Sequence, residues 1–176
     1  MGKNSQTASF ENETFRISRT FDAPRALMFE LWTDVEHLTR WWGPKGFRVT
    51  HAALDLRPGG RFHYCLKSPD GTDMWGKFQF RRVEAPELLE FISSFSDKDG
   101  GTTRHPMHQS WPLELLSIVT FAEADGRTTV TVQWTPHNAS ALERQTFIDG
   151  AKSMEMGWTG TFDQLEAYVE RAKASA

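Results

Sequence analysis

The sequence has little of what marks a secreted, membrane-bound or nucleic-acid-binding protein. Cys65 is its one cysteine, so no internal disulfide can form, and a single thiol fits a reducing compartment. A formal net charge of −3 lacks the basic excess of a general nucleic-acid binder. No apolar run approaches the ~18 residues of a membrane-spanning helix, and the N-terminus lacks the apolar stretch of a signal peptide. We therefore expect a cytoplasmic protein with neither a nucleic acid nor a membrane as partner.

Aromatic residues, by contrast, are plentiful, and most of them are Phe or Trp. The 176 residues include thirteen Phe and seven Trp but only two Tyr. Because Phe and Trp bury large areas, the composition predicts either a bulky core or a cavity lined by rings. The length favours one domain with a real core of its own. We predict a single domain over residues 14–173, preceded by a disordered polar tail over residues 1–13.

Alternating apolar residues and turn signals predict a series of strands. The predicted strands are 14–21, 47–56, 61–68, 74–83, 88–95, 113–124 and 128–136. Two short helices should follow the first strand. An apolar stripe at Leu27, Met28, Leu31 and Trp32 forms the first, and Gly43-Pro44 must end the second.

The C-terminal segment predicts one long helix. Ser140 and Glu143 have the spacing of a capping box. Apolar residues then recur at steps of three and four from Phe147 to Val169, over about 30 residues in all. The elements together predict an α+β fold, in which a curved six- or seven-stranded antiparallel sheet wraps around this helix.

Six motifs in this order resemble those of a known family. They are "FDAPRALMFELWTD", "RWWGPKGF", "LDLRPGGRF", "SPDG", "DGRTTVTVQW" and "GWTGTFDQLEAYV". The chain resembles, from about Phe15 to Val169, the bacterial homologues of the C-terminal domain of the activator of the 90-kDa heat-shock protein ATPase. This AHSA-type domain belongs to the START-like, or SRPBCC, superfamily. The resemblance implies a helix-grip fold with an internal cavity for an apolar or amphipathic molecule, and no shared catalytic motif.

Large rings from the sheet and the long helix are the predicted lining of that cavity. Tyr64, His51 and Trp111 are the polar groups that we expect to orient a small hydrophobic ligand. The full set of predicted ligand-binding residues is Trp42, His51, Phe62, Tyr64, Phe78, Phe91, Trp111, Phe121, Trp134, Met154, Trp158 and Phe162. Any one of them could equally serve as ordinary core. We predict no cofactor, and a homodimer is possible.

The sequence gives only weak support for a metal site or for catalysis by a cysteine nucleophile. His105 and His108 are the nearest approach to a metal pair, but Pro106 breaks any helix that would present both, and zinc needs three or four ligands. Cys65 and His63 lie two apart on one strand face, at about 6–7 Å, which is too far for a nucleophile and its base. Two alternatives to ligand binding stay open: an enzyme of the cyclase, aromatase or hydrolase kind, and a module that binds a chaperone or regulator.

The adjacent tryptophans Trp41 and Trp42 precede the chain reversal at Gly43-Pro44. We expect one indole to pack in the core and the other to lie at the rim of the cavity. The sequence leaves open which residue has which role.

Overall fold

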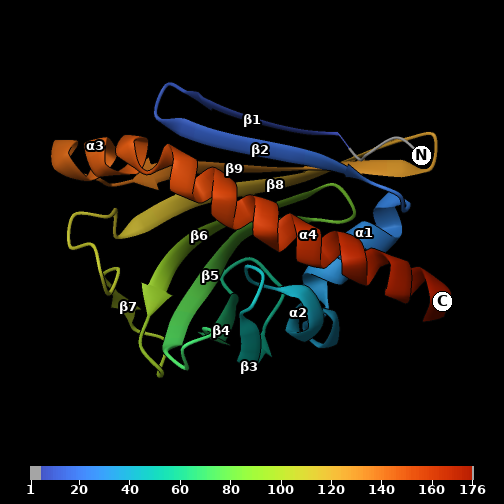
Figure 1. Cartoon of the computed structure of the whole chain (residues 1–176), viewed down its shortest axis with the longest axis horizontal. Coiled ribbons are helices and arrows are strands. Elements are labelled where there is room, and N and C mark those ends of the chain that lie inside the picture. The colour runs from blue at the N-terminus through green and yellow to red at the C-terminus, as the bar shows by residue number, and fades with distance from the viewer. Residues whose placement is uncertain (1–4, 176) are drawn as a thin grey trace.

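A curved antiparallel sheet crossed by a long C-terminal helix dominates the computed structural model, which describes residues 5–175 (Figure 1). The strands are β1 (Gln6–Glu11), β2 (Thr14–Phe21), β3 (Arg48–Leu54), β4 (Arg61–Lys67), β5 (Asp73–Glu84), β6 (Leu88–Ser96), β7 (Thr102–Thr103), β8 (Glu114–Ala124) and β9 (Arg127–His137). The helices are α1 (Arg25–Thr33), α2 (Val35–Trp41), α3 (Ala141–Asp149) and α4 (Ala151–Ser175). This is the predicted α+β class.

The strands follow the order β1-β2-β9-β8-β6-β5-β4-β3, with the two-residue β7 beside β6. All pairs are antiparallel, because tight turns join most of the neighbours. Between β8 and β9, Asp125 and Gly126 have φ of 54° and 74°. Two central residues with positive φ are typical of a type I′ hairpin turn, so the local sequence "DG" fixes this register.

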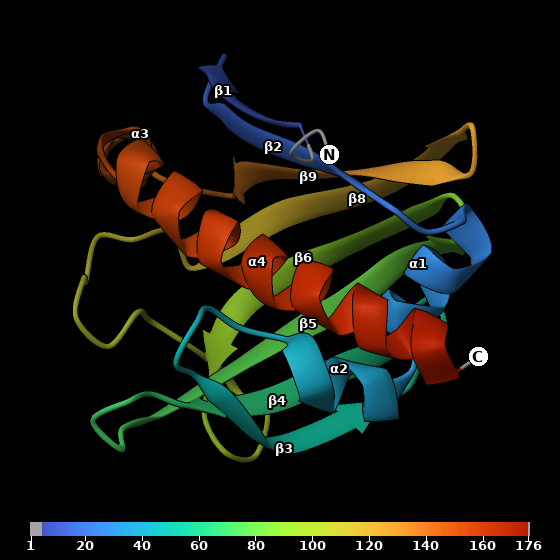
Figure 2. The same ribbon diagram turned by 45° about the vertical axis from the view of Figure 1, so that its right-hand side comes forward.

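The concave face of the sheet carries the core, and α4 runs diagonally across it (Figures 1 and 2). Alternate residues of β2 are buried, as the period of two requires. Phe21 from this set meets Phe162 of α4 edge to face, with ring centroids 5.5 Å apart. The apolar face of α4 and the concave face of the sheet thus enclose one hydrophobic core.

Helices α1 and α2 cover one end of this interior, where α1 contacts β8 and β9, and α2 contacts β3 and α4 (Figure 2). The Asp34 side chain accepts a hydrogen bond from the Glu36 backbone N–H at 2.8 Å and caps α2. The helix ends at Trp41, and Trp42 already has extended backbone. This ending directs the two adjacent indoles into different surroundings.

The strand count and the N-terminal tail differ from the predictions. The sheet has nine strands, and the expected disorder of residues 1–13 is wrong for Gln6–Glu11, which pairs along β2. The sequence of this edge strand shows no apolar alternation, because Phe10 is the one large apolar residue among its six, and the Phe10 ring lies 5.6 Å from the Phe147 ring. Residues 1–4 of the predicted tail lie outside the described residues.

The predicted single C-terminal helix is two helices that meet at Gly150. The capping box of Ser140 and Glu143 is present at the start of α3. A Cβ at Gly150 would lie 3.0 Å from the Trp111 ring, and one at Gly160 would lie 3.4 Å from the Lys45 backbone nitrogen. These two glycines therefore allow other segments to approach the helices closely.

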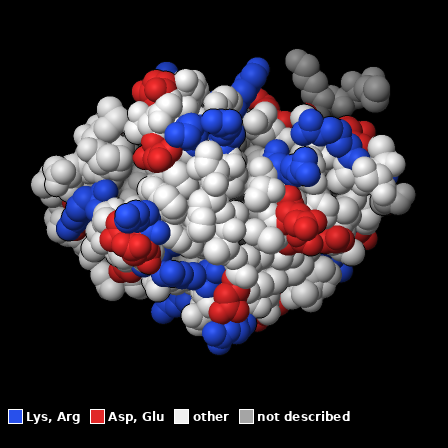
Figure 3. Space-filling view, turned by 90° about the horizontal axis from the view of Figure 1, so that it is seen from below, with Lys and Arg blue, Asp and Glu red and all other residues white. Residues whose placement is uncertain are grey.

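The surface carries charges of both signs. On the face in Figure 3, basic and acidic side chains are interspersed, with broad uncharged areas between them. Within residues 5–175, no helix is both long enough and apolar enough to cross a membrane.

Candidate functional site

Strands β4 and β5 supply the floor of an aromatic cluster in the interior. Phe62 and Tyr64 share one face of β4, where Phe78 of β5 lies opposite Phe62 and Gly76 opposite Tyr64. The Tyr64 ring lies over Gly76 so closely that a Cβ there would be 2.5 Å from the Tyr64 hydroxyl oxygen. Gly76 therefore makes room for the phenol ring.

Three indoles from three helical segments complete this aromatic cluster. Trp42 meets Phe78 at 5.2 Å and Trp158 of α4 at 5.8 Å, measured between ring centroids. Trp32 of α1 stacks on Trp158 at 6.2 Å. All three indoles are buried. We use "ring cluster" below for Trp32, Trp42, Phe62, Tyr64, Phe78 and Trp158.

The adjacent tryptophans differ in how their N–H groups are satisfied. The Trp41 indole Nε1 donates to the backbone carbonyl of Leu31 at 2.8 Å, and its side chain is fully enclosed. The indole Nε1 atoms of Trp42 and Trp32 are buried and find no acceptor among the described residues. Trp41 is therefore the core anchor, while Trp42 brings an unpaired donor into the ring cluster.

Tyr64 adds a hydroxyl to these two indoles. Burial raises the pKa of Tyr64 above its ordinary value, because a phenolate would lose its hydration. The nearby Trp42 indole lowers that pKa to a smaller extent, although its N–H does not reach hydrogen-bonding geometry. The phenol thus stays protonated at neutral pH, and two donors converge on one region of the ring cluster.

Most of the other predicted ligand-binding residues adjoin the ring cluster. Phe91 stacks on Phe78 at 4.0 Å, and Phe121 meets Trp32 at 6.0 Å. Trp134 and Phe162 each lie 5.5 Å from Trp158. Met154 is buried on the same face of α4.

Trp111 lies elsewhere, at the α3 end of the molecule. Its ring contacts Phe147 at 5.5 Å and His105 at 6.2 Å. The predicted His105 and His108 pair lies in the same loop, with ring centroids 5.0 Å apart, and the His105 Nδ1 accepts from the Met107 backbone. Trp111 thus belongs to a second group of rings and does not meet the ring cluster.

His51 is misplaced in the sequence-based prediction, because it lies on the outer face of the sheet. A register shift between Val49 and His51 inserts one residue into β3, which turns His51 away from the interior and Ala52 toward it. His51 is exposed and contacts His63 at 5.4 Å and Trp75 at 5.3 Å. It cannot line the interior.

The buried basic side chains of that outer face, His63 and Lys77, are satisfied by backbone carbonyls. His63 pairs through Nε2 with the Asp97 carbonyl at 3.1 Å, and Lys77 Nζ donates to the Gly100 carbonyl at 2.9 Å. Loss of hydration lowers the pKa of both side chains. These contacts fasten the 97–101 turn and explain the burial of both groups without a ligand.

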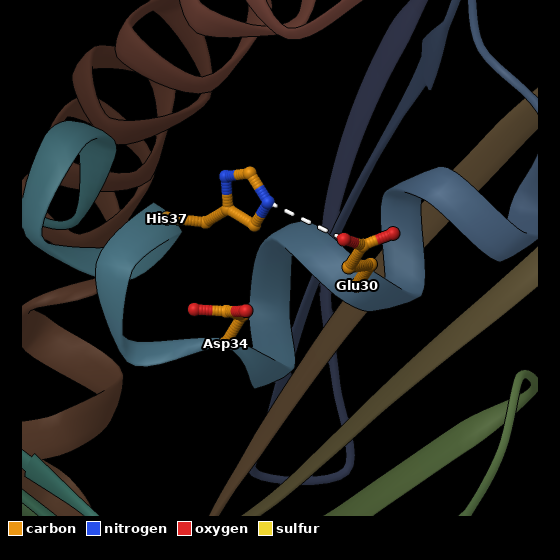
Figure 4. Close-up of side chains that lie close together, drawn as sticks. All are labelled: Glu30, Asp34 and His37. Carbon is orange, nitrogen blue, oxygen red and sulfur yellow. Dashed lines mark ion pairs between the residues drawn. The ribbon is translucent and has the colours of Figure 1, made fainter. Parts of the chain in front are cut away.

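A polar groove lies on the far side of α1 and α2 from the ring cluster. It encloses about 810 Å³ between these helices and the C-terminal half of α4. Its lining residues are Leu27, Glu30, Glu36, His37, Thr39, Arg40, Tyr168, Arg171, Ala172 and Ser175. Beside it, ligand atoms of Glu30, Asp34 and His37 all lie within 4.8 Å of one another (Figure 4).

This acidic and imidazole group was missed at the level of sequence. Its signal was the spacing of Glu30, Asp34 and His37 at i, i+4 and i+7, which places residues on one helical face. The sequence-based prediction includes no metal site. Helix α1 ends before α2 begins, but the two helices remain neighbours, so the three side chains still lie close together.

The chain is similar to a sequence family over most of its length. Residues 22–170 match the model of the family described as Activator of Hsp90 ATPase homolog 1-like protein. No curated protein matches the chain.

Solved structures share the fold. A crystal structure from Mycobacterium smegmatis is 28% identical, with a TM-score of 0.76 over 94% of this chain and 96% of that chain. A solution structure from Arthrobacter aurescens is 27% identical, with a TM-score of 0.78 over 94% and 91%. An AHSA1 protein from Silicibacter pomeroyi, at 20% identity, has a TM-score of 0.68 over 90% and 99%, and shows the fold alone. By its sequence match and its fold, the chain belongs to the family of Activator of Hsp90 ATPase homolog 1-like proteins.

Proposed function

We propose that this protein binds a small, mainly apolar molecule that carries a hydrogen-bond acceptor, and that the ring cluster is the binding site. The observation that carries the proposal is the pair of buried indole N–H groups, on Trp32 and Trp42, without an acceptor among the described residues. Beside them, the protonated Tyr64 hydroxyl offers a third donor.

Unpaired donors in an apolar interior are costly. Each buried polar group without a partner costs roughly 1–3 kcal/mol, so most native structures avoid them. A ligand carbonyl or carboxylate placed between Trp42 and Tyr64 would satisfy the indole and hydroxyl donors together. The same two groups would reject a pure hydrocarbon of equal shape, because it leaves them unpaired.

The rings around these donors suit a flat or aliphatic ligand body. Phe, Trp and Tyr provide apolar faces, and Met154 adds a flexible side chain that adapts to different shapes. The rings of the cluster touch one another, so a ligand would enter by displacing side chains. The segment 43–47 beside Trp42, with positive φ at Gly43 and Gly46, is the neighbouring connection that would have to yield.

A matched pair of probes tests the proposal. 2-Acetylnaphthalene and 2-isopropenylnaphthalene have nearly the same shape, and only the ketone oxygen is a good hydrogen-bond acceptor. We expect the ketone to bind several-fold more tightly, as measured by intrinsic tryptophan fluorescence, and to shift the indole N–H signals of Trp32 and Trp42 in nitrogen-15 NMR spectra.

The variant W42F should narrow the difference between the two probes, and W75F, on the outer face, should leave it unchanged. The proposal fails if neither probe binds up to its solubility, or if both bind equally to the wild type. It also fails if W42F loses stability but keeps the preference, since the indole would then serve the fold alone.

The enzyme and partner-binding alternatives stay predictions. The first requires an acid–base pair inside the ring cluster. Arg19 is a buried charged group beside the interior: its guanidinium lies 5.6 Å from the centre of the Phe162 ring and pairs with Asp163 of α4 at 2.8 Å. This ion pair fastens α4 to β2. A guanidinium stays protonated in proteins, so Arg19 cannot serve as a base.

A further inference from the structure

We propose that Glu30, Asp34 and His37 form a binding site for a divalent transition-metal cation, and name zinc as its best-fitting member. The three side chains come from the end of α1, the connection and the first turns of α2 (Figure 4). Their ligand atoms lie within 4.8 Å of one another. Bonds of about 2.0–2.2 Å around one zinc ion place donor atoms roughly 3.3–3.5 Å apart, so small side-chain rotations complete the site.

His37 is oriented for this role by a residue from another helix. Its Nδ1 is 2.8 Å from the Tyr168 hydroxyl of α4, which leaves Nε2 directed at Glu30, 3.5 Å from Oε1. Metal-binding histidines usually engage their second ring nitrogen in such a hydrogen bond, which fixes both tautomer and ring direction. Arg171 lies over the Tyr168 ring at 5.5 Å and restrains it in turn.

Asp34 is held as firmly by its capping role. Its Oδ1 accepts from the Glu36 backbone N–H, so the carboxylate is fixed and keeps acceptor capacity for a cation. The Glu30 carboxylate has the His37 ring as its one ion-pair contact given by the structure, and that contact is an ion pair only when the imidazole is protonated. A divalent cation would neutralise both carboxylates and bind the unprotonated imidazole.

The donor set selects the class of metal. One imidazole with two carboxylates favours transition metals over Mg²⁺ and Ca²⁺, which prefer oxygen ligands alone. Three protein ligands leave at least one position free for water or a further ligand. That position adjoins the polar groove, where Arg40 and Arg171 would favour an anionic co-ligand.

The test is isothermal titration of the metal-free full chain with zinc chloride. We expect one saturable site per chain, with weaker binding of Mn²⁺ and much weaker binding of Mg²⁺. The variants E30Q, D34N and H37Q should each lower zinc affinity at least tenfold. D34N is the most informative of them, because Asn also caps helices and so keeps α2 while it removes the charge.

Two control variants separate this site from general surface attraction. E36Q removes a neighbouring carboxylate of the same groove and should leave zinc affinity within about twofold of the wild type. A double variant, H105Q with H108Q, removes the other histidine pair and should also bind normally. Circular dichroism of every variant confirms that it is folded.

Three outcomes would overturn the site: no saturable zinc binding by the wild type, equal losses in E36Q and E30Q, or loss of binding only in the double histidine variant.

The variant Y168F tests whether Tyr168 positions the His37 ring or only supports the fold. We expect it to weaken zinc binding about tenfold while the circular dichroism spectrum stays unchanged. Unchanged affinity would remove Tyr168 from the proposal.

Discussion

The ring cluster and the polar groove are built on the same helices, but the first is apolar and buried while the second is polar and exposed. Trp32 and Glu30 are two residues apart on α1, one stacked in the interior and the other exposed beside His37. In the ring cluster, apolar surface is abundant and two donors lack acceptors. In the groove, the carboxylates of Glu30 and Asp34 lie close to the His37 imidazole. The contrast shows how one pair of short helices can serve two sites, because its faces meet different surroundings.

The largest effect on stability is expected from W41A, in the core beside the ring cluster, where the Trp41 and Trp42 ring centroids are 5.7 Å apart. Trp41 is enclosed and hydrogen-bonded to Leu31, so its removal leaves a cavity and an unpaired carbonyl. We expect the free energy of unfolding to fall by about 3–5 kcal/mol in urea titrations. E30Q, on the exposed side of the neighbouring helix, should stay within about 0.5 kcal/mol of the wild type. Similar losses in both variants would erase the distinction between the two regions.

A smaller effect is expected from G76A, which probes how tightly the ring cluster is packed. The added methyl would meet the Tyr64 ring at less than contact distance, so the phenol must move. We expect a loss of about 1–3 kcal/mol in the free energy of unfolding. The matched control is G157A, where no atom lies within 4 Å of the added Cβ and the helix should gain up to about 1 kcal/mol. Stabilisation by both substitutions would show that the interior has room to spare.

The smallest effect concerns Glu143, a carboxylate outside both regions, at the start of α3. Hydrogen bonding by the Ser140 backbone N–H, and then the Arg104 guanidinium, lower the pKa of Glu143 from 4.5 to about 2. A lowered folded-state pKa means that the ionised carboxylate stabilises the fold above pH 4.5, and that this contribution is lost as the pH falls toward 2.

E143Q should therefore be less stable than the wild type at neutral pH, and the difference should shrink between pH 4.5 and pH 2. Thermal unfolding followed across this range measures it. A difference that stays constant with pH would mean that the carboxylate charge contributes nothing at the start of α3.

Local sequence patterns were sufficient to predict many of the helices and strands. Thr14–Phe21 has the predicted bounds of the first strand, and the capping box at Ser140 begins a helix as predicted. These features depend on residues within a few positions of one another, where alternation and capping chemistry act. The ring cluster was also anticipated in large part, since alternation on β4 and β5 places Phe62, Tyr64 and Phe78 on one face.

The failures share a different physical cause. The bulge before His51 depends on how β3 meets β4, so the prediction that His51 orients a ligand in the interior was wrong. Gln6–Glu11 becomes a strand because β2 offers it a partner, and its own polar sequence gives little sign of this. Gly150 ends α3 where Trp111 approaches from a distant loop. Each error reflects a contact between segments far apart in the chain.

The sequence by itself determined the fold class and the excess of large rings, because period, turn chemistry and composition are local properties, and its six motifs carried the resemblance to the family. Only the tertiary structure decided that Trp41 is the anchor and Trp42 carries an unpaired donor, since a carbonyl ten residues away satisfies the first indole alone. It also decided that Tyr168 of α4 orients His37, 131 residues earlier, toward two carboxylates. Hydrogen bonds between distant residues form, or fail to form, only when packing fixes the positions of both partners, so the tertiary structure decided the polar groups of both candidate sites.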